Sequence, residues 1–172
     1  MKPILTAVVI AALTASAVPA AGQSASQIAR VRGGSSCAGC NLFQAGLSGL
    51  EARGLNLSGA RLRQADLSLS VMNRTRFANA DMRDVEAYGG VFSGSNFSGA
   101  NLANASFVGA YLDGASFRGA RLDGANFGGA SLEHATGLTQ ARLSQACGDE
   151  ATRLPRGLSI PRCRSALDLT AN

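Results

Sequence analysis

The chain has 172 residues, the length of about one domain, and a formal net charge of +5 at pH 7. It contains no Trp, two Tyr and 21 Gly, a composition that argues against a core built on large aromatic side chains and favours a narrow interior that repeats. A basic balance is also the opposite of what a protein mimicking the charge of DNA requires.

Residues 1–20 have the pattern of a secretory signal peptide. One lysine precedes an apolar run that ends near Leu13, and small residues surround Ala20 and Ala21, so cleavage is expected after one of these two. The apolar run is too short for a good membrane span, and no stable membrane insertion is expected after cleavage. We therefore predict a periplasmic or secreted protein.

Residues 21–36 are small and polar and show no period. Such a composition is typical of a flexible leader. Val31 is the side chain in it that we expect to touch the first ordered layer.

A period of five residues begins at Cys40 and keeps one phase as far as Ala135. We call its large apolar positions centres; they run in steps of five from Leu42 to Gly137, and 17 of the 20 are Leu, Phe or Met. A small residue stands two places before each centre, and Gly often stands two places after it. Neither an α-helix nor a strand has this period. It fits a chain that turns a corner every five residues and buries the centre, with four sides closing a coil and coils stacking at strand spacing.

The repeat resembles the pentapeptide-repeat family, whose motif is A(D/N)LXX. The best matches are Ala65-Asp66-Leu67, Ala80-Asp81-Met82, Ala100-Asn101-Leu102 and Ala125-Asn126-Phe127. The resemblance implies an all-β solenoid, a right-handed quadrilateral β-helix of about five coils, over residues 37–137.

Departures from the motif predict local changes in the core. Where the centre shrinks to Ala52 or Ala87, the preceding small position grows to Leu50 or Val85, so large and small residues exchange places at roughly constant volume. Leu55 has no such compensation and is expected to distort the first coil.

Residues 138–172 are expected to form a C-terminal helical cap and an irregular tail. Thr139 can cap a short helix that extends to about Cys147, with Gly148 ending it. Such a helix laid across the last coil would hinder end-to-end stacking.

Four cysteines in an exported chain are expected to form disulfides, and the sequence alone allows three pairings. About five coils would separate the two ends by roughly 24 Å. We therefore expect Cys147 to pair with Cys163 and staple the tail, while Cys37 and Cys40 are either bridged locally or reduced. Their C-x-x-C spacing occurs in redox and zinc sites, but here it runs into the first coil instead of a helix, which favours a structural role.

No pattern in the sequence predicts catalysis. His134 should lie on the surface, with no Ser, Cys or carboxylate predictably beside it. None of the spaced glycines leads into a helix with a lysine, as a phosphate loop would. We expect a protein that is not an enzyme and that holds no cofactor and no metal.

Binding surfaces are better candidates, because residues 20 apart stack on the same side. One column and the corner beside it predict an exposed apolar strip, a feature that often marks a partner site, although Val and Tyr also suit strand surfaces in general. The candidate partner surface consists of Leu69, Val71, Tyr88, Val91, Val108 and Tyr111.

Arginines cluster in the first coils and form a candidate basic patch. Asp81 and Asp84 are interspersed with them, which favours a solvated face; the functional alternative is an anionic surface such as lipid headgroups or polysaccharide. The patch consists of Arg61, Arg63, Arg74, Arg76 and Arg83.

Together these features favour a non-catalytic exported interaction or structural protein. It would use the faces of a β-helix to dock an envelope protein or an anionic surface, and no nucleic acid. Two alternatives stay open: a thiol/redox module at Cys37 and Cys40, and a DNA-mimicking topoisomerase inhibitor, a role that the resemblance includes for some members. The second is disfavoured because mimicry requires an acidic chain.

Overall fold

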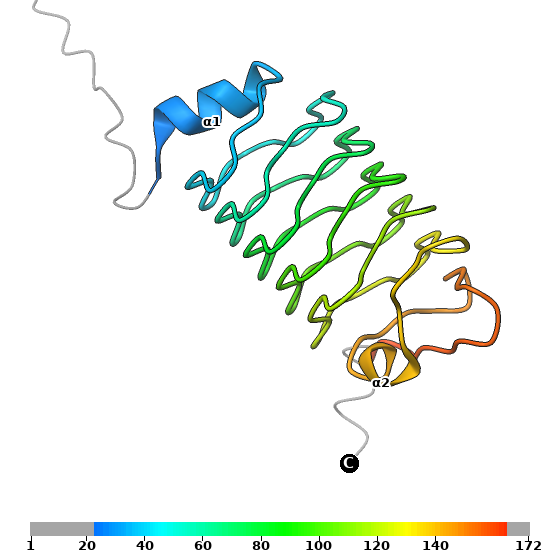
Figure 1. Ribbon diagram of the computed structural model, residues 1–172. Coiled ribbons are helices and arrows are strands. Elements are labelled where there is room, and N and C mark those ends of the chain that lie inside the picture. Colours follow the sequence, from blue (N-terminus) through cyan, green and yellow to red (C-terminus); the bar gives the residue numbers. More distant parts are fainter. Residues whose placement is uncertain (1–22, 165–172) are drawn as a thin grey trace, which may run out of the picture.

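The computed structural model describes residues 23–164, in which the chain winds into a stack of coils with a helix at each end. Helix α1 (Ala25–Arg32) lies at the N-terminal end of the stack, and the short helix α2 (Gln140–Leu143) lies near the C-terminal end (Figure 1). Within the described residues, neither helix has the length and apolar character needed to cross a membrane. The expected signal peptide, residues 1–20, lies outside the described residues.

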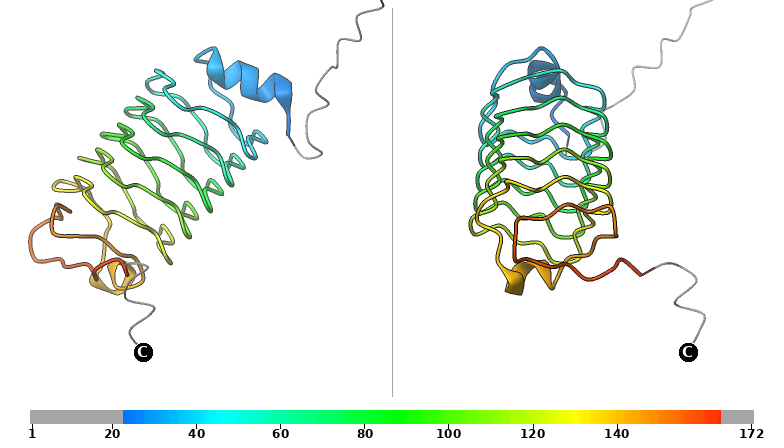
Figure 2. Two further views of the ribbon diagram at one scale, coloured as in Figure 1. Left: turned by 180° about the vertical axis from the view of Figure 1, so that it is seen from behind. Right: turned by 90° about the vertical axis from the view of Figure 1, so that its right-hand side faces the viewer.

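Parallel backbone bridges join each coil to the next. They recur every five residues and pair residues 20 apart, from Asn41↔Arg61 to Ser116↔Thr136. Each is an isolated bridge, because a corner interrupts every side before a longer strand can form. The predicted period of five therefore appears as four sides per coil, which we number from Asn41. Figure 2 shows the coils in register along the stack.

The centres fill the interior. All of them from Leu42 to Leu132 are buried, together with most of the small residues two places before them. Phe77, Phe97 and Phe117 stack face to face, with ring centroids 5.0 and 5.2 Å apart. Burial of apolar side chains of this size is the main stabilising contribution available to a narrow solenoid.

The predicted exchange of large and small residues is present at both places. Val85 is fully buried beside Ala87, and Leu50 is partly buried against the core beside Ala52. The distortion expected at Leu55 is also present, since a bend replaces the hydrogen-bonded turn that forms the other corners of the coils.

Residues 25–32 correct the prediction of a flexible leader over residues 21–36, because they form α1. Val31 is fully buried, the Arg32 guanidinium donates two hydrogen bonds to the Gly46 carbonyl at 2.7 and 3.0 Å, and Gln27 Oε1 accepts one from the Asn41 N–H. A helix of this length is marginal alone. Docking onto the first coil stabilises it, a contribution that local composition does not reveal.

The C-terminal helix is shorter than predicted. Thr139 caps it as expected, with its hydroxyl accepting from the Arg142 N–H, but α2 ends at Leu143 instead of near Cys147. The Gly124 N–H binds the Gln145 carbonyl at 2.7 Å, which draws the chain back onto the stack.

The residues after α2 continue the stack as a partial coil. The bridges Asn126↔Cys147 and Ser131↔Arg153 follow the same two sides as before, with one and then two extra residues taken up by the helix. The helix therefore replaces one side of a further coil; it is not a lid over the last one, which corrects the predicted cap. A last bridge, Gly148↔Arg162, adds the tail as an outer layer.

All four cysteines are paired. Cys147 and Cys163 form the predicted disulfide, with their α-carbons 4.7 Å apart, and it closes the tail onto the partial coil. Cys37 and Cys40 are bridged locally, with α-carbons 5.5 Å apart, at the first layer of the stack.

Candidate functional site

Six apolar side chains meet at one corner of the stack, between its second and third sides. Val71, Val91 and Tyr111 lie on successive coils and are joined by bridges. Leu69 lies in the turn that precedes Val71, at a φ of 57°. We call this surface the apolar corner; it comprises Leu69, Val71, Tyr88, Val91, Val108 and Tyr111.

A missing side chain gives Leu69 its place. The Leu69 N–H binds the Tyr88 carbonyl at 2.8 Å, which puts the two residues side by side on neighbouring coils. A β-carbon added to Gly89 would lie 3.0 Å from Leu69 Cδ2, so the leucine side chain rests over the glycine. This packing keeps Leu69 beside Tyr88 on the outside of the corner.

The exposure of this corner is unusual for the molecule. Leu69, Tyr88 and Tyr111 are 60%, 55% and 57% exposed, and they are the exposed large hydrophobic side chains of residues 23–164. Single exposed apolar residues are ordinary, but a gathered set is typical of an interaction surface. The structure therefore brings together the residues that the sequence predicted.

Carboxylates border the apolar corner. Asp66 and Glu86 are exposed and bridge each other on the preceding side, and Glu51 bridges Val71 at the N-terminal end of the column. A partner that matches this corner would carry basic groups next to apolar ones.

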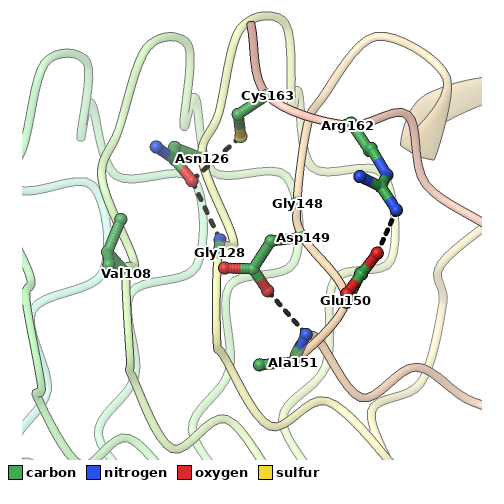
Figure 3. A pocket seen from close by; sticks show the side chains of 9 residues that line it. All are labelled: Val108, Asn126, Gly128, Gly148, Asp149, Glu150, Ala151, Arg162 and Cys163. Atoms are coloured by element: carbon green, nitrogen blue, oxygen red, sulfur yellow. Dashed lines mark hydrogen bonds and ion pairs between the residues drawn. The ribbon is translucent and has the colours of Figure 1, made fainter. Parts of the chain in front are cut away.

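A cleft of about 540 Å³ adjoins the corner, between the coil stack and the tail (Figure 3). Val108 belongs to both, so the apolar corner continues into the cleft. Its lining residues are Val108, Asn126, Gly128, Gly148, Asp149, Glu150, Ala151, Arg162 and Cys163.

Asp149 holds the wall of the cleft in place. Its carboxylate accepts hydrogen bonds from the N–H groups of Gly129, Ala151 and Thr152 at 2.8, 2.9 and 3.0 Å, and from the Thr152 hydroxyl. The bond from Gly129, followed by those from Thr152 and Ala151, lowers the pKa of Asp149 below its ordinary value. Since Gly129 belongs to the stack and Ala151 to the partial coil, Asp149 ties the two together.

Glu150 and Arg162 form an ion pair at the mouth of the cleft, with both side chains exposed. Exposed ion pairs contribute little stability, so this one mainly shapes the opening (Figure 3). The sequence gave no period or motif that singled out Asp149, Glu150 or Arg162, although the Asp-x-x-Thr spacing of Asp149 and Thr152 is typical of a side-chain-capped turn.

A second hollow, of about 370 Å³, lies on the other side of the corner. Tyr111 and Ser131 line it from the stack, and Ala151 and Arg153 line it from the partial coil. Hollows therefore flank the apolar corner at its C-terminal end on both sides.

The five arginines of the candidate basic patch do not make one surface. Arg61, Arg63 and Arg83 lie on the first side or its corner, whereas Arg74 lies at the end of the third side and Arg76 at the start of the fourth. On a four-sided coil, the first and third corners are opposite each other.

Aspartates compensate part of this charge. Arg83 binds the Asp81 carboxylate at 2.7 Å, which lowers the pKa of Asp81, and Arg63 lies 3.5 Å from Asp84. The arrangement is that of a solvated, charge-laced face.

The Cys37–Cys40 disulfide does not have the setting of a redox site. The two residues are 4% and 8% exposed, whereas reactive cysteines are accessible and stand at helix N-termini or beside cations. Cys40 occupies an inward small position, and the pair closes the first layer.

His134 differs from its prediction in one respect, since a carboxylate does lie beside it. Its Nδ1 is 2.8 Å from Asp113 Oδ1, and the same oxygen accepts from the His134 N–H. Both side chains are largely exposed. Among the described residues, no group of three His, Cys, Asp or Glu side chains is placed to hold a metal ion.

A protein-family model described as pentapeptide repeats matches the chain in 8 copies, over residues 53–86, 95–133 and 110–147. These ranges together cover just over half of the 172 residues. No curated protein matches the chain.

Several solved structures are similar to the chain. A pentapeptide repeat protein from the thylakoid lumen of Arabidopsis thaliana has 25% identity and a TM-score of 0.42, over 56% of this chain and 68% of that one. A pentapeptide repeat protein from the cyanobacterium Cyanothece 51142 has 20% identity and a TM-score of 0.35, over 75% and 97%. A plasmid-mediated fluoroquinolone resistance protein has 20% identity and a TM-score of 0.40, over 78% and 80%.

Proposed function

This chain belongs to the pentapeptide repeat family, and on that basis we propose that it is a non-catalytic exported interaction protein whose apolar corner docks a partner. Pentapeptide repeat proteins are in general structural or interaction proteins and fold as right-handed quadrilateral β-helices. The proposal includes this fold, with about five coils. Bridges every five residues and the offset of 20 residues between bridged partners support it.

The gathering of exposed large hydrophobic side chains at one corner carries the proposal. A stack of coils has four corners with similar backbones, and chance would distribute such residues among them. Instead Leu69, Tyr88 and Tyr111 share one. Their exposure costs solubility, so a partner that covers them gives the arrangement a reason.

The proposed partner is a protein of the cell envelope or of the exterior. Its contact segment would present apolar side chains beside Lys or Arg, matching Asp66, Glu86 and Glu51 around the corner. The signal-like residues 1–20 and the two disulfides support export, since disulfides persist in oxidising compartments.

The other candidates receive less support. An anionic surface would need the arginines on one face, and they are divided between opposite corners. A thiol/redox module would need accessible sulfur atoms at Cys37 and Cys40, which are buried. A DNA mimic would need an acidic chain, and this one is basic.

Affinity capture from the envelope fraction, with single substitutions at the corner, tests the proposal. Tyr111→Asp places a charge on the apolar corner, and we expect it to remove the captured partner. Asn96→Asp is the matched control, because it adds the same charge at the same register on the fourth side and keeps an oxygen to accept from the Ser98 N–H. Undiminished capture by Tyr111→Asp would place the docking surface elsewhere.

A further inference from the structure

The apolar corner and the end of the described chain lie next to each other. Arg162 and Cys163 line the same cleft as Val108. Cys163 is fixed there by its disulfide to Cys147 and by a hydrogen bond from its N–H to the Gly148 carbonyl at 2.9 Å. Residues 165–172 therefore continue from an anchored point beside the corner. From this arrangement we propose that residues 165–172 cover the apolar corner, and that the partner docks by displacing them.

The sequence of this segment matches an apolar strip. Residues 165–172 read SALDLTAN, in which Leu167, Leu169 and Ala171 alternate with Asp168 and Thr170. In an extended segment, this alternation places the apolar side chains on one face and the polar ones on the other.

The length of the segment suits the distance. The layers of Arg162 and Tyr88 are four steps apart along the stack, roughly 19 Å at strand spacing. The six residues from Cys163 to Leu169 span about 20 Å when extended. Leu167 then comes level with Val108, and Leu169 approaches Tyr88.

Tethering makes a weak contact sufficient. Because Cys163 is fixed at the cleft, a short linker gives the segment an effective concentration in the millimolar range at the corner. Burial of two leucine side chains supplies the attraction. Asp168 and Thr170 leave the bordering carboxylates Asp66 and Glu86 unmatched, so a partner with both apolar and basic groups competes successfully. This inference rests on the proposed function only for the displacement step.

The two tyrosines of the chain, Tyr88 and Tyr111, make the test specific. With no Trp present, tyrosine fluorescence and tyrosine ring resonances report on the apolar corner alone. In the unaltered chain, we expect nuclear Overhauser effects between the methyl groups of Leu167 or Leu169 and a tyrosine ring. Their absence would overturn the proposal without any variant.

A variant gives the second readout. Replacing both leucines, Leu167→Ser with Leu169→Ser, is expected to increase acrylamide quenching of tyrosine fluorescence, whereas Asp168→Ser on the opposite face should leave it unchanged. Equal quenching in all three chains would overturn the proposal. Far-UV circular dichroism confirms that the fold is retained, and the Overhauser measurement decides where it is not.

Capture of a partner separates the two proposals. If the segment fails to contact the tyrosines but Tyr111→Asp still loses the partner, the docking surface holds and the covering segment is refuted. If the contacts are present and no substitution at the corner changes capture, the corner is a site of internal packing and the proposed function is refuted.

Discussion

Gly137 shows how a single residue ends the repeat. It stands where the next centre would be, but it is exposed and has a φ of 74°, turning the chain from the stack into α2. A β-carbon there would lie 2.5 Å from the backbone nitrogen of Arg118 and 2.7 Å from its α-carbon. Backbone atoms do not move aside as a flexible side chain does.

We therefore predict that Gly137→Ala is markedly destabilising. The left-handed conformation costs about 1–2 kcal/mol for a residue with a β-carbon, and overpacking against Arg118 adds about 1–3 kcal/mol. Gly59→Ala is the matched control, since Gly59 has a φ of 67° and nothing within 4 Å of the added carbon; it should lose the conformational part alone. Chemical denaturation of both variants measures the difference, and equal losses would contradict the role assigned to the close approach.

At the residue scale, the sequence predicted which side chains are buried but not the backbone of every corner. Glycine after the centre was expected to supply the left-handed conformation, yet several corners use another residue. Leu69 at a φ of 57° and Arg74 at 56° are examples. Tertiary hydrogen bonds to the neighbouring coil impose the turn there, and local propensity does not contain that information.

The partial coil after α2 depends on Asp149, whose carboxylate joins it to the stack. Because the folded-state pKa of this group is lowered, its contribution is present above the pKa of the unfolded chain, about 3.9. It is lost as the pH falls through the lower folded value. The tail should therefore detach more readily in acid than at neutral pH.

We predict that Asp149→Asn lowers the denaturation midpoint at pH 7, because the amide keeps an acceptor but loses the charge that strengthens its hydrogen bonds. The difference from the unaltered chain should shrink as the pH is lowered below about 4, where the native carboxylate is protonated as well. Denaturation curves at pH 7 and in acid give both differences. A difference independent of pH would show that the charge of Asp149 has no part in holding the tail.

At the element scale, predictability followed the repeat. The period of five determined the coils, and the cysteine spacing determined the Cys147–Cys163 pair, because both depend on regular geometry. The helix α1 and the Asp149 turn were missed, since each is stabilised by contacts with the end of the stack and not by its own sequence. The apolar corner was found from the offset of 20 residues, whereas the cleft beside it was not, because the path of the tail has no period.

At the scale of the whole molecule, each coil contacts only its neighbours, so stability is transmitted along one axis. The interior is a single column without a second layer to compensate for a defect. Phe107 lies in it between Phe97 and Phe127, with ring centroids 5.8 and 5.6 Å away. The next residue, Val108, lies outside at the apolar corner. The same substitution at these two adjacent positions therefore separates the column from the surface.

We predict that Phe107→Asp abolishes the β-type circular dichroism, whereas Val108→Asp retains it. An uncompensated carboxylate in the column costs several kcal/mol, to which the lost aromatic packing adds a further 3–5 kcal/mol or so. That total approaches the whole stability of a typical domain, about 5–15 kcal/mol. Far-UV spectra and thermal melts of the two variants provide the measurement. A Phe107→Asp chain that melts like the unaltered protein would mean that the aromatic centres do not hold the coils together, and the docking corner would then lack the rigid support on which its arrangement depends.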